Sequence, residues 1–103
     1  MSFSIELTRE AEQDLEGIFE YIAVTLCSPE NGVGQLDRLE KAIASLCDLP
    51  ERFRVYEREP WTSRGLRIMP ADNYLVFYIP DAGTGKVTVL RIMYGGRDTQ
   101  KQL

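Results

Sequence analysis

Arginine residues are the most prominent chemically capable side chains in the second half of the chain. A guanidinium group binds phosphate oxygens through paired hydrogen bonds and stays charged at physiological pH, so a cluster of them suits nucleic acid or another anionic partner. The pattern allows one concave anion-binding site that is lined by three arginines and has three more around it. The lining residues are Arg67, Arg91 and Arg97, and the surrounding residues are Arg52, Arg54 and Arg58.

Arg67 and Arg91 also allow a second interpretation, because each lies inside an apolar stretch that we expect to be a strand. An arginine in such a place must be paired, lie at an edge or be exposed. Both would then be surface residues on a sheet face that no helix covers, paired with an acid such as Asp72, Asp81 or Glu57. The sequence leaves the two interpretations open.

Tyrosines form a second group that could do chemistry. Tyr94 directly precedes Gly95-Gly96 at the end of an apolar run. A phenol in that place could stack on a base or transfer a proton. Tyr74 and Tyr78 lie inside an apolar stretch, so we expect them in the core of a sheet.

The 103-residue chain contains no histidine. This excludes the Ser-His-Asp and Cys-His arrangements, the usual zinc and haem ligand sets and an imidazole acid–base pair. Glu16 and Glu20, four residues apart, are expected on a solvated helix face rather than at a metal. Cys27 and Cys47 end two successive helical patterns roughly 25–30 Å apart, too far for a disulfide. We expect no metal and no cofactor.

The net charge of −4 conceals an uneven distribution. Residues 1–50 carry three basic and ten acidic residues, a balance of −7, whereas residues 51–103 carry nine basic and six acidic residues, a balance of +3.

A composition of 44% hydrophobic and 27% charged residues is typical of one globular domain, here spanning residues 1–103. The sequence contains neither a signal peptide nor an apolar run of the roughly 18 residues that a membrane span needs. We therefore expect a cytoplasmic protein.

Hydrophobic periodicity predicts two helices after a short strand at 3–7. Thr8 is an expected N-cap, followed by an apolar stripe of Ala11, Leu15, Ile18, Ile22 and Leu26. Ser28 and Pro29 begin a second helix with Val33, Leu36, Leu39, Ile43 and Leu46 on its apolar face. A short link between two amphipathic helices indicates an antiparallel hairpin.

Three strands are predicted after an arginine-rich stretch at 51–65, which is expected to be a loop or a ragged strand. They cover 66–69, 74–79 and 86–94, with the last in the centre of the sheet. Strict alternation along 86–94 would place Val87, Val89, Arg91 and Met93 on one face. The fold class is therefore α+β, in the order β-α-α-β-β-β, with a helical hairpin on one face of a small, mainly antiparallel sheet.

Several runs in this order resemble the RelE/ParE toxins of type II toxin–antitoxin systems. The helical part includes LTREAEQDL at 7–15, IFEYIA at 18–23 and SPE at 28–30, and the strand part includes GLR at 65–67, NYLVFY at 73–78 and VTVLRI at 87–92 followed by YGGRD at 94–98. The resemblance spans nearly the whole chain. It implies the same fold and a growth inhibitor that a cognate antitoxin neutralises, with a heterotetramer as one expected assembly.

The family divides in its mode of action. The resemblance favours a ParE-like toxin directed at DNA gyrase, because histidine is absent, the hairpin is long and the chain is acidic overall. The alternative is a RelE-like, ribosome-dependent mRNA endoribonuclease. In that case Arg67 and Arg97 would stabilise the phosphorane and Tyr94 would act as acid or base, although the aromatic residue expected a few positions after Arg97 is missing. A third alternative is an inactive or regulatory member that only binds antitoxin.

Overall fold

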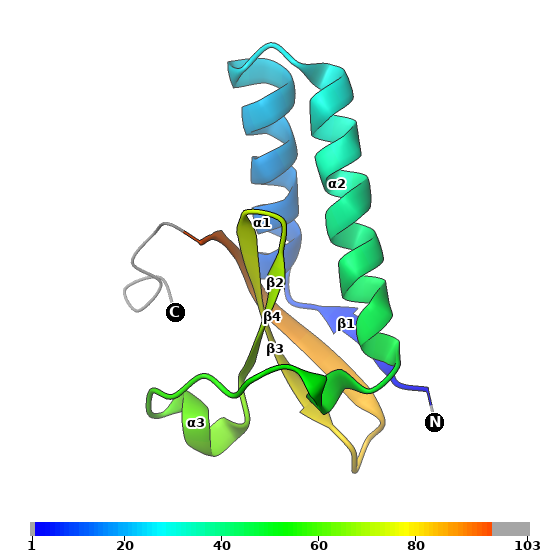
Figure 1. Cartoon of the computed structure of the whole chain (residues 1–103), viewed down its shortest axis with the longest axis vertical. Helices are drawn as coiled ribbons and strands as arrows, with labels where there is room; N and C mark the ends of the chain where they lie inside the picture. Colours follow the sequence, from blue (N-terminus) through cyan, green and yellow to red (C-terminus); the bar gives the residue numbers. More distant parts are fainter. Residues whose placement is uncertain (1, 96–103) are drawn as a thin grey trace.

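Four strands form one mixed sheet, and a long helical hairpin lies against one of its faces (Figure 1). The computed structural model describes residues 2–95. The sheet has the order β1-β4-β3-β2, with β1 parallel to β4 and the other neighbours antiparallel. The elements are β1 (Ser4–Leu7), α1 (Arg9–Glu20), a π-helical turn (Tyr21–Thr25), α2 (Pro29–Ala44), α3 (Trp61–Arg64), β2 (Arg67–Ala71), β3 (Tyr74–Asp81) and β4 (Lys86–Tyr94). The predicted α+β class, the order of the two long helices and four strands and the inner position of 86–94 are confirmed, while the short helix α3 lies in the stretch 51–65 that was expected to be a loop or a ragged strand.

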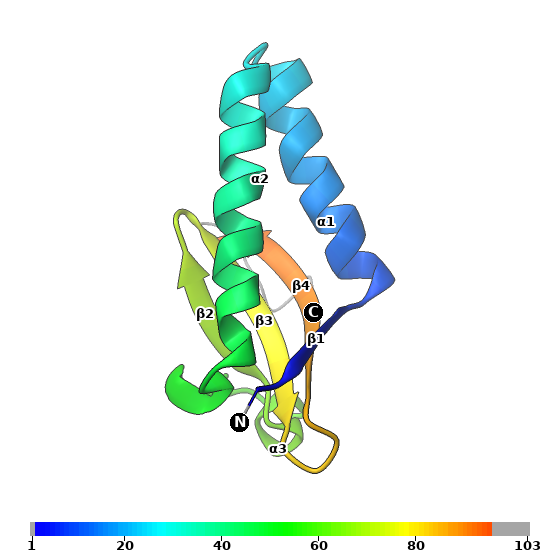
Figure 2. The ribbon, with the colours of Figure 1, turned by 90° about the vertical axis from the view of Figure 1, so that its right-hand side faces the viewer.

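Local sequence signals explain where the hairpin begins and turns. The Thr8 hydroxyl accepts a hydrogen bond of 3.1 Å from the amide of Ala11, which satisfies one of the free N–H groups in the first turn of α1. Ser28 stands at the N-cap of α2 and Pro29 opens it, although the Ser28 side chain makes no capping bond. Figure 2 shows the two helices side by side, extending well beyond the sheet.

The contact between the helices differs from the predicted apolar stripe at one turn. Leu26 and Val33 were expected on the buried faces of the two helices but are 54% and 58% exposed, whereas Gly32 is buried. A Cβ atom on Gly32 would lie 3.1 Å from Ala23 Cβ and 3.3 Å from the carbonyl oxygen of Phe19. The glycine therefore lets the two helix backbones approach closely, a role that a count of apolar residues does not reveal.

A bulge in β4 corrects the predicted alternation. Phe77 pairs with Arg91 and Tyr78 with Val89, so Leu90 stands opposite no residue of β3. The extra residue changes which side chains share a face beyond that point. Val87, Val89 and Ile92 lie in one core, whereas Met93 lies in another and Leu90 packs against it. Met93 therefore does not share a face with Val87 and Val89, as strict alternation required.

Two hydrophobic clusters lie on the two faces of the sheet. The main core joins the hairpin to the sheet through Ala11, Leu15, Leu39, Ile43 and Leu46 on the helical side and Met69, Val76, Tyr78, Val87, Val89 and Ile92 on the sheet side. On the alternate strand positions, the second cluster consists of Tyr56, Leu66, Ile68, Phe77 and Met93, with Trp61 packed against it. The face expected to be uncovered is thus partly covered by the segment that precedes β2.

The predicted strands 66–69 and 74–79 stop just before Pro70 and Pro80, whereas both prolines lie inside the observed strands. Pro70 belongs to β2, which is an edge strand, and Pro80 belongs to β3 beyond the last residue that pairs with β2. At such places the missing N–H leaves no gap in the sheet ladder. Cys27 and Cys47 are both free, as predicted. No helix within residues 2–95 is long and apolar enough to cross a membrane.

Candidate functional site

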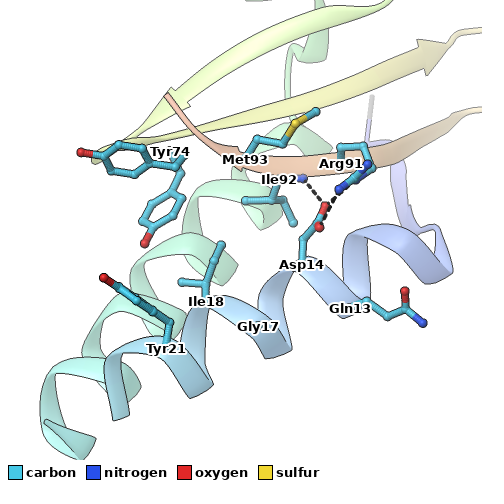
Figure 3. Close-up of a pocket in the computed structure, with 10 residues that line it drawn as sticks. Gln13, Asp14, Gly17, Ile18, Tyr21, Tyr74, Arg91, Ile92 and Met93 are labelled. Atoms are coloured by element: carbon cyan, nitrogen blue, oxygen red, sulfur yellow. Dashed lines mark hydrogen bonds and ion pairs between the residues drawn. The ribbon is translucent and has the colours of Figure 1, made fainter. Parts of the chain in front are cut away.

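A groove of about 670 Å³ lies between α1 and β4, where β4 extends past the end of its neighbour β1 (Figure 3). Pairing of β1 with β4 stops at Leu7 and Val89. Beyond that point the chain has turned into α1, so the helix faces the remaining part of β4. The groove is thus a consequence of a four-residue strand beside a nine-residue strand.

The carboxylate of Asp14 on α1 replaces the missing strand at the floor of the groove. It accepts hydrogen bonds from Arg91 Nε at 2.7 Å and from Arg91 Nη2 at 3.0 Å, and also from the backbone amide of Ile92 at 2.9 Å. Thr8 acts similarly next to it, because its amide donates to the Val89 carbonyl at 3.0 Å. The hydrogen bond that Arg91 donates to Asp14 raises the pKa of the Arg91 guanidinium. This pair therefore fixes the position of β4 against α1.

Three tyrosines line the groove beside this ion pair. Tyr74 and Tyr94 meet edge to face, with ring centroids 5.8 Å apart, and Tyr21 lies on the helical side (Figure 3). Tyr94 and Tyr21 are 50% and 55% exposed. Nothing lies within 4 Å of where a Cβ of Gly17 would be, so the helix leaves open space there. The groove offers aromatic surface and phenol groups to a bound segment.

At the other end of the sheet, Arg67 holds the chain that follows α2. Its Nη1 donates to the carbonyl oxygens of Glu51 at 3.1 Å and Phe53 at 2.6 Å. Arg52 donates to the carbonyl oxygens of Ser45 at 3.3 Å and Leu49 at 3.1 Å. Carbonyl groups after a helix lack partners and favour a nearby cation. Both arginines therefore have structural partners.

Tyr78 also binds the chain that follows α2, from within the main core. It is fully buried, and its hydroxyl donates to the carbonyl oxygen of Pro50 at 2.6 Å. Burial raises the pKa of Tyr78 to about 12, against a smaller opposing effect of Arg67 and Arg52. The prediction that Tyr78 is a core residue is confirmed. Tyr74, for which the same was predicted, is only half-buried and packs against the main core.

The predicted concave cluster around Arg67 and Arg91 does not form among the described residues. Arg67 lies on β2 and Arg91 on β4, with β3 between them, and each is bonded to a different part of the chain. Arg54 and Arg58 are exposed on the segment before β2. Arg97 lies outside the described residues.

The second interpretation of the arginines also needs correction, since the partner of Arg91 is Asp14 rather than Asp72. Asp72 instead accepts hydrogen bonds from Arg38 at 2.8 Å and Gln35 at 3.0 Å, and the Arg38 bond is the main cause that lowers its pKa. Sequence reasoning missed Asp14, although one signal existed. Asp14 lies three residues after Ala11 and four before Ile18, so it stands on the apolar stripe where a charged side chain needs a partner.

The comparisons with known proteins agree with this architecture. A family model described as the ParE toxin of the type II toxin–antitoxin system parDE matches residues 5–99. Among curated proteins, none matches the sequence.

Solved toxin structures share the fold at low sequence identity. A structure of the chromosomal ParDE system from P. aeruginosa is 19% identical with a TM-score of 0.73, and the match covers 90% of this chain and 96% of the other. The toxin–antitoxin complex RelBE2 from Mycobacterium tuberculosis is 20% identical with a TM-score of 0.65, covering 91% and 99%. A mutant of the E. coli toxin RelE in the free state is 11% identical with a TM-score of 0.68, covering 99% and 93%.

Proposed function

We propose, given that this chain belongs to the ParE toxin family of type II toxin–antitoxin systems, that it inhibits bacterial growth by binding DNA gyrase and that a cognate antitoxin neutralises it. Such a toxin would act in the cytoplasm, where its target is. The toxin would have two protein partners, an antitoxin that neutralises it and a target that it inhibits. Each has its own support.

The single observation that favours a binder over a nuclease is the separation of Arg67 from Tyr94. Cleavage of RNA needs cations and a proton-transfer group around one phosphate. Within the described residues, Arg67 is engaged with backbone carbonyls on β2, while Tyr94 ends β4 on the far side of β3. The remaining groove arginine, Arg91, is held by Asp14.

Support for an antitoxin partner comes from the groove and from the solved relatives. The RelBE2 structure and the E. coli RelBE structure are toxin–antitoxin complexes. In this chain, the groove beside Tyr21, Tyr74 and Tyr94 is concave and partly apolar, which suits a segment of a partner chain laid along it. We propose that the antitoxin occupies this groove, in a heterotetramer whose stoichiometry light scattering would measure.

Two measurements test the proposed target, one on purified protein and one in induced cells. Purified protein should inhibit gyrase supercoiling of relaxed plasmid, and added antitoxin should restore it. In induced cells, mapping of RNA 5′ ends should find intact mRNA alongside a DNA-damage response. Codon-positioned cuts with normal supercoiling would instead assign the RelE-like activity. Absence of growth arrest would leave only antitoxin binding and regulation.

A further inference from the structure

The end of the helical hairpin exposes large apolar side chains, most of which lie outside the groove between α1 and β4. We define the hairpin tip as residues 20–33, which hold the π-helical turn and the start of α2. Four of its side chains are more than half exposed: Tyr21 at 55%, Val24 at 70%, Leu26 at 54% and Val33 at 58%. Large apolar side chains exposed together at one end of a domain usually mark an interaction site.

The charge around the hairpin tip is of one sign. Residues 20–33 contain two acidic residues, Glu20 and Glu30, and no lysine or arginine. Glu20 directly precedes Tyr21, Glu30 lies between Leu26 and Val33, and both acids are exposed. Glu30 in the first turn of α2 is where the helix dipole favours an acid, but Glu20 in the last turn of α1 is where it favours Lys or Arg, so helix stability does not account for Glu20.

This sign of charge excludes two kinds of occupant. Nucleic acid would be repelled by the carboxylates. A second copy of this chain would bring its own acidic tip against the first, and like charges at close range oppose association. The occupant that fits is a protein whose apolar surface is surrounded by Lys or Arg.

The shape of the hairpin tip indicates what kind of protein that is. Figures 1 and 2 show the tip projecting away from the sheet as the furthest part of the molecule. A projecting surface needs a folded partner with a concavity, whereas a segment of a small partner chain fits the concave groove between α1 and β4. The groove and the hairpin tip therefore suit different partners.

We infer that the hairpin tip is the surface by which this toxin docks on its protein target, inserting Val24, Leu26 and Val33 into an apolar concavity ringed by basic residues. This inference rests on the proposed function in that the target is a protein, and it names the toxin surface involved. Tyr21 belongs to both surfaces, whereas Val24, Leu26 and Val33 do not line the groove, so substitutions at Val24 and Val33 separate the two contacts.

The test uses the double variant Val24→Asp/Val33→Asp, compared with Ala82→Asp/Thr84→Asp, which adds the same charge at exposed positions of the β3–β4 loop. The tip variant should lose growth arrest and raise the toxin concentration needed to inhibit gyrase by at least about tenfold. Its affinity for antitoxin should stay within about twofold of the parent protein. The loop variant should behave as the parent in all three assays.

A charge reversal tests the basic ring. Glu20→Lys/Glu30→Lys should weaken target binding by roughly tenfold. Added salt should weaken target binding by the parent protein, because it screens attraction, and should strengthen binding by this variant, because it screens repulsion. The comparison is Glu40→Lys/Glu57→Lys, which changes two exposed acids away from the tip. Circular dichroism would show that all four variants stay folded.

The outcomes separate this inference from the proposed function. If the parent protein arrests growth without affecting gyrase, the choice of gyrase is wrong, yet loss of arrest in the tip variant still supports the docking surface. If the tip variant arrests growth like its parent, or loses antitoxin affinity instead, the inference is overturned. If the parent protein causes no arrest at all, both are overturned.

Discussion

Asp14 and Arg91 are 77 residues apart in the sequence and are joined by two hydrogen bonds, of 2.7 and 3.0 Å, between α1 and β4. Their side chains are only 16% and 26% exposed. The same carboxylate accepts the amide of Ile92 at 2.9 Å. One acidic side chain thus ties the helical hairpin to the inner strand and shapes the groove that we assign to the antitoxin.

Replacing Asp14 by Ala should therefore destabilise the fold. It leaves the Arg91 guanidinium without this partner and the Ile92 amide without an acceptor, at a cost of about 2–4 kcal/mol in the free energy of unfolding. Urea denaturation followed by circular dichroism measures this. The matched control is Glu16→Ala, an exposed acid on the same helix, which should change stability by less than about 0.5 kcal/mol. Equal effects of the two variants would contradict the role of Asp14.

Asp14 also shows which structural features can be predicted from the sequence and which cannot. Local signals predicted the Thr8 cap and the bounds of β4, since caps and apolar runs act within a few residues. The partner of Arg91 depends on the bulge at Leu90, which changes the strand's faces and leaves no mark in the apolar pattern. Long-range pairs of this kind follow from strand register rather than from spacing.

A second cause of error is that periodicity counts apolar residues and overlooks close backbone contact. Val33 was predicted to lie on the buried face of α2, whereas the two helices meet at Gly32. Likewise, the stretch 51–65 has no period, yet Tyr56 and Trp61 from it cover the second face of the sheet.

The two glycines of α2 should respond oppositely to the same substitution. Gly34→Ala should raise stability by about 0.5–1 kcal/mol, because its Cβ would meet only the movable end of Arg38, at 3.2 Å. Gly32→Ala should lower it by roughly 1 kcal/mol, since its Cβ would press on Ala23 and the backbone of Phe19. Thermal unfolding of the pair measures the difference. A gain in both variants would show that the helices separate freely.

Removing the Tyr78 hydroxyl should destabilise the fold at neutral pH. Tyr78→Phe leaves the buried Pro50 carbonyl without its 2.6 Å donor, which should cost about 1–2 kcal/mol. Denaturant unfolding at pH 7 measures this. Tyr21→Phe, which changes an exposed ring, serves as the control and should be close to neutral.

Alkaline pH should affect the same residue with a defined sign. Burial raises the pKa of Tyr78 from 10.0 to about 12, so the folded state keeps the neutral phenol that the unfolded chain loses first. The stabilising contribution is complete below pH 10 and should fall by roughly 2 kcal/mol as the pH approaches 12. Unfolding curves between pH 8 and 12 should therefore converge for the parent protein and Tyr78→Phe. Parallel curves would contradict a Tyr78 pKa above the ordinary value.

Tyr94→Phe should leave the toxin active, and this outcome separates binding from RNA cleavage. The substitution keeps the ring that packs against Tyr74 at a centroid distance of 5.8 Å and removes only the phenol that could transfer a proton. A gyrase-directed toxin should then keep its inhibition within about twofold. A nuclease that used Tyr94 as acid or base should lose about 100-fold or more in cleavage rate. Growth arrest and RNA 5′-end mapping in the same induced culture measure both, and loss of arrest together with loss of mRNA cuts would refute the gyrase-directed mode.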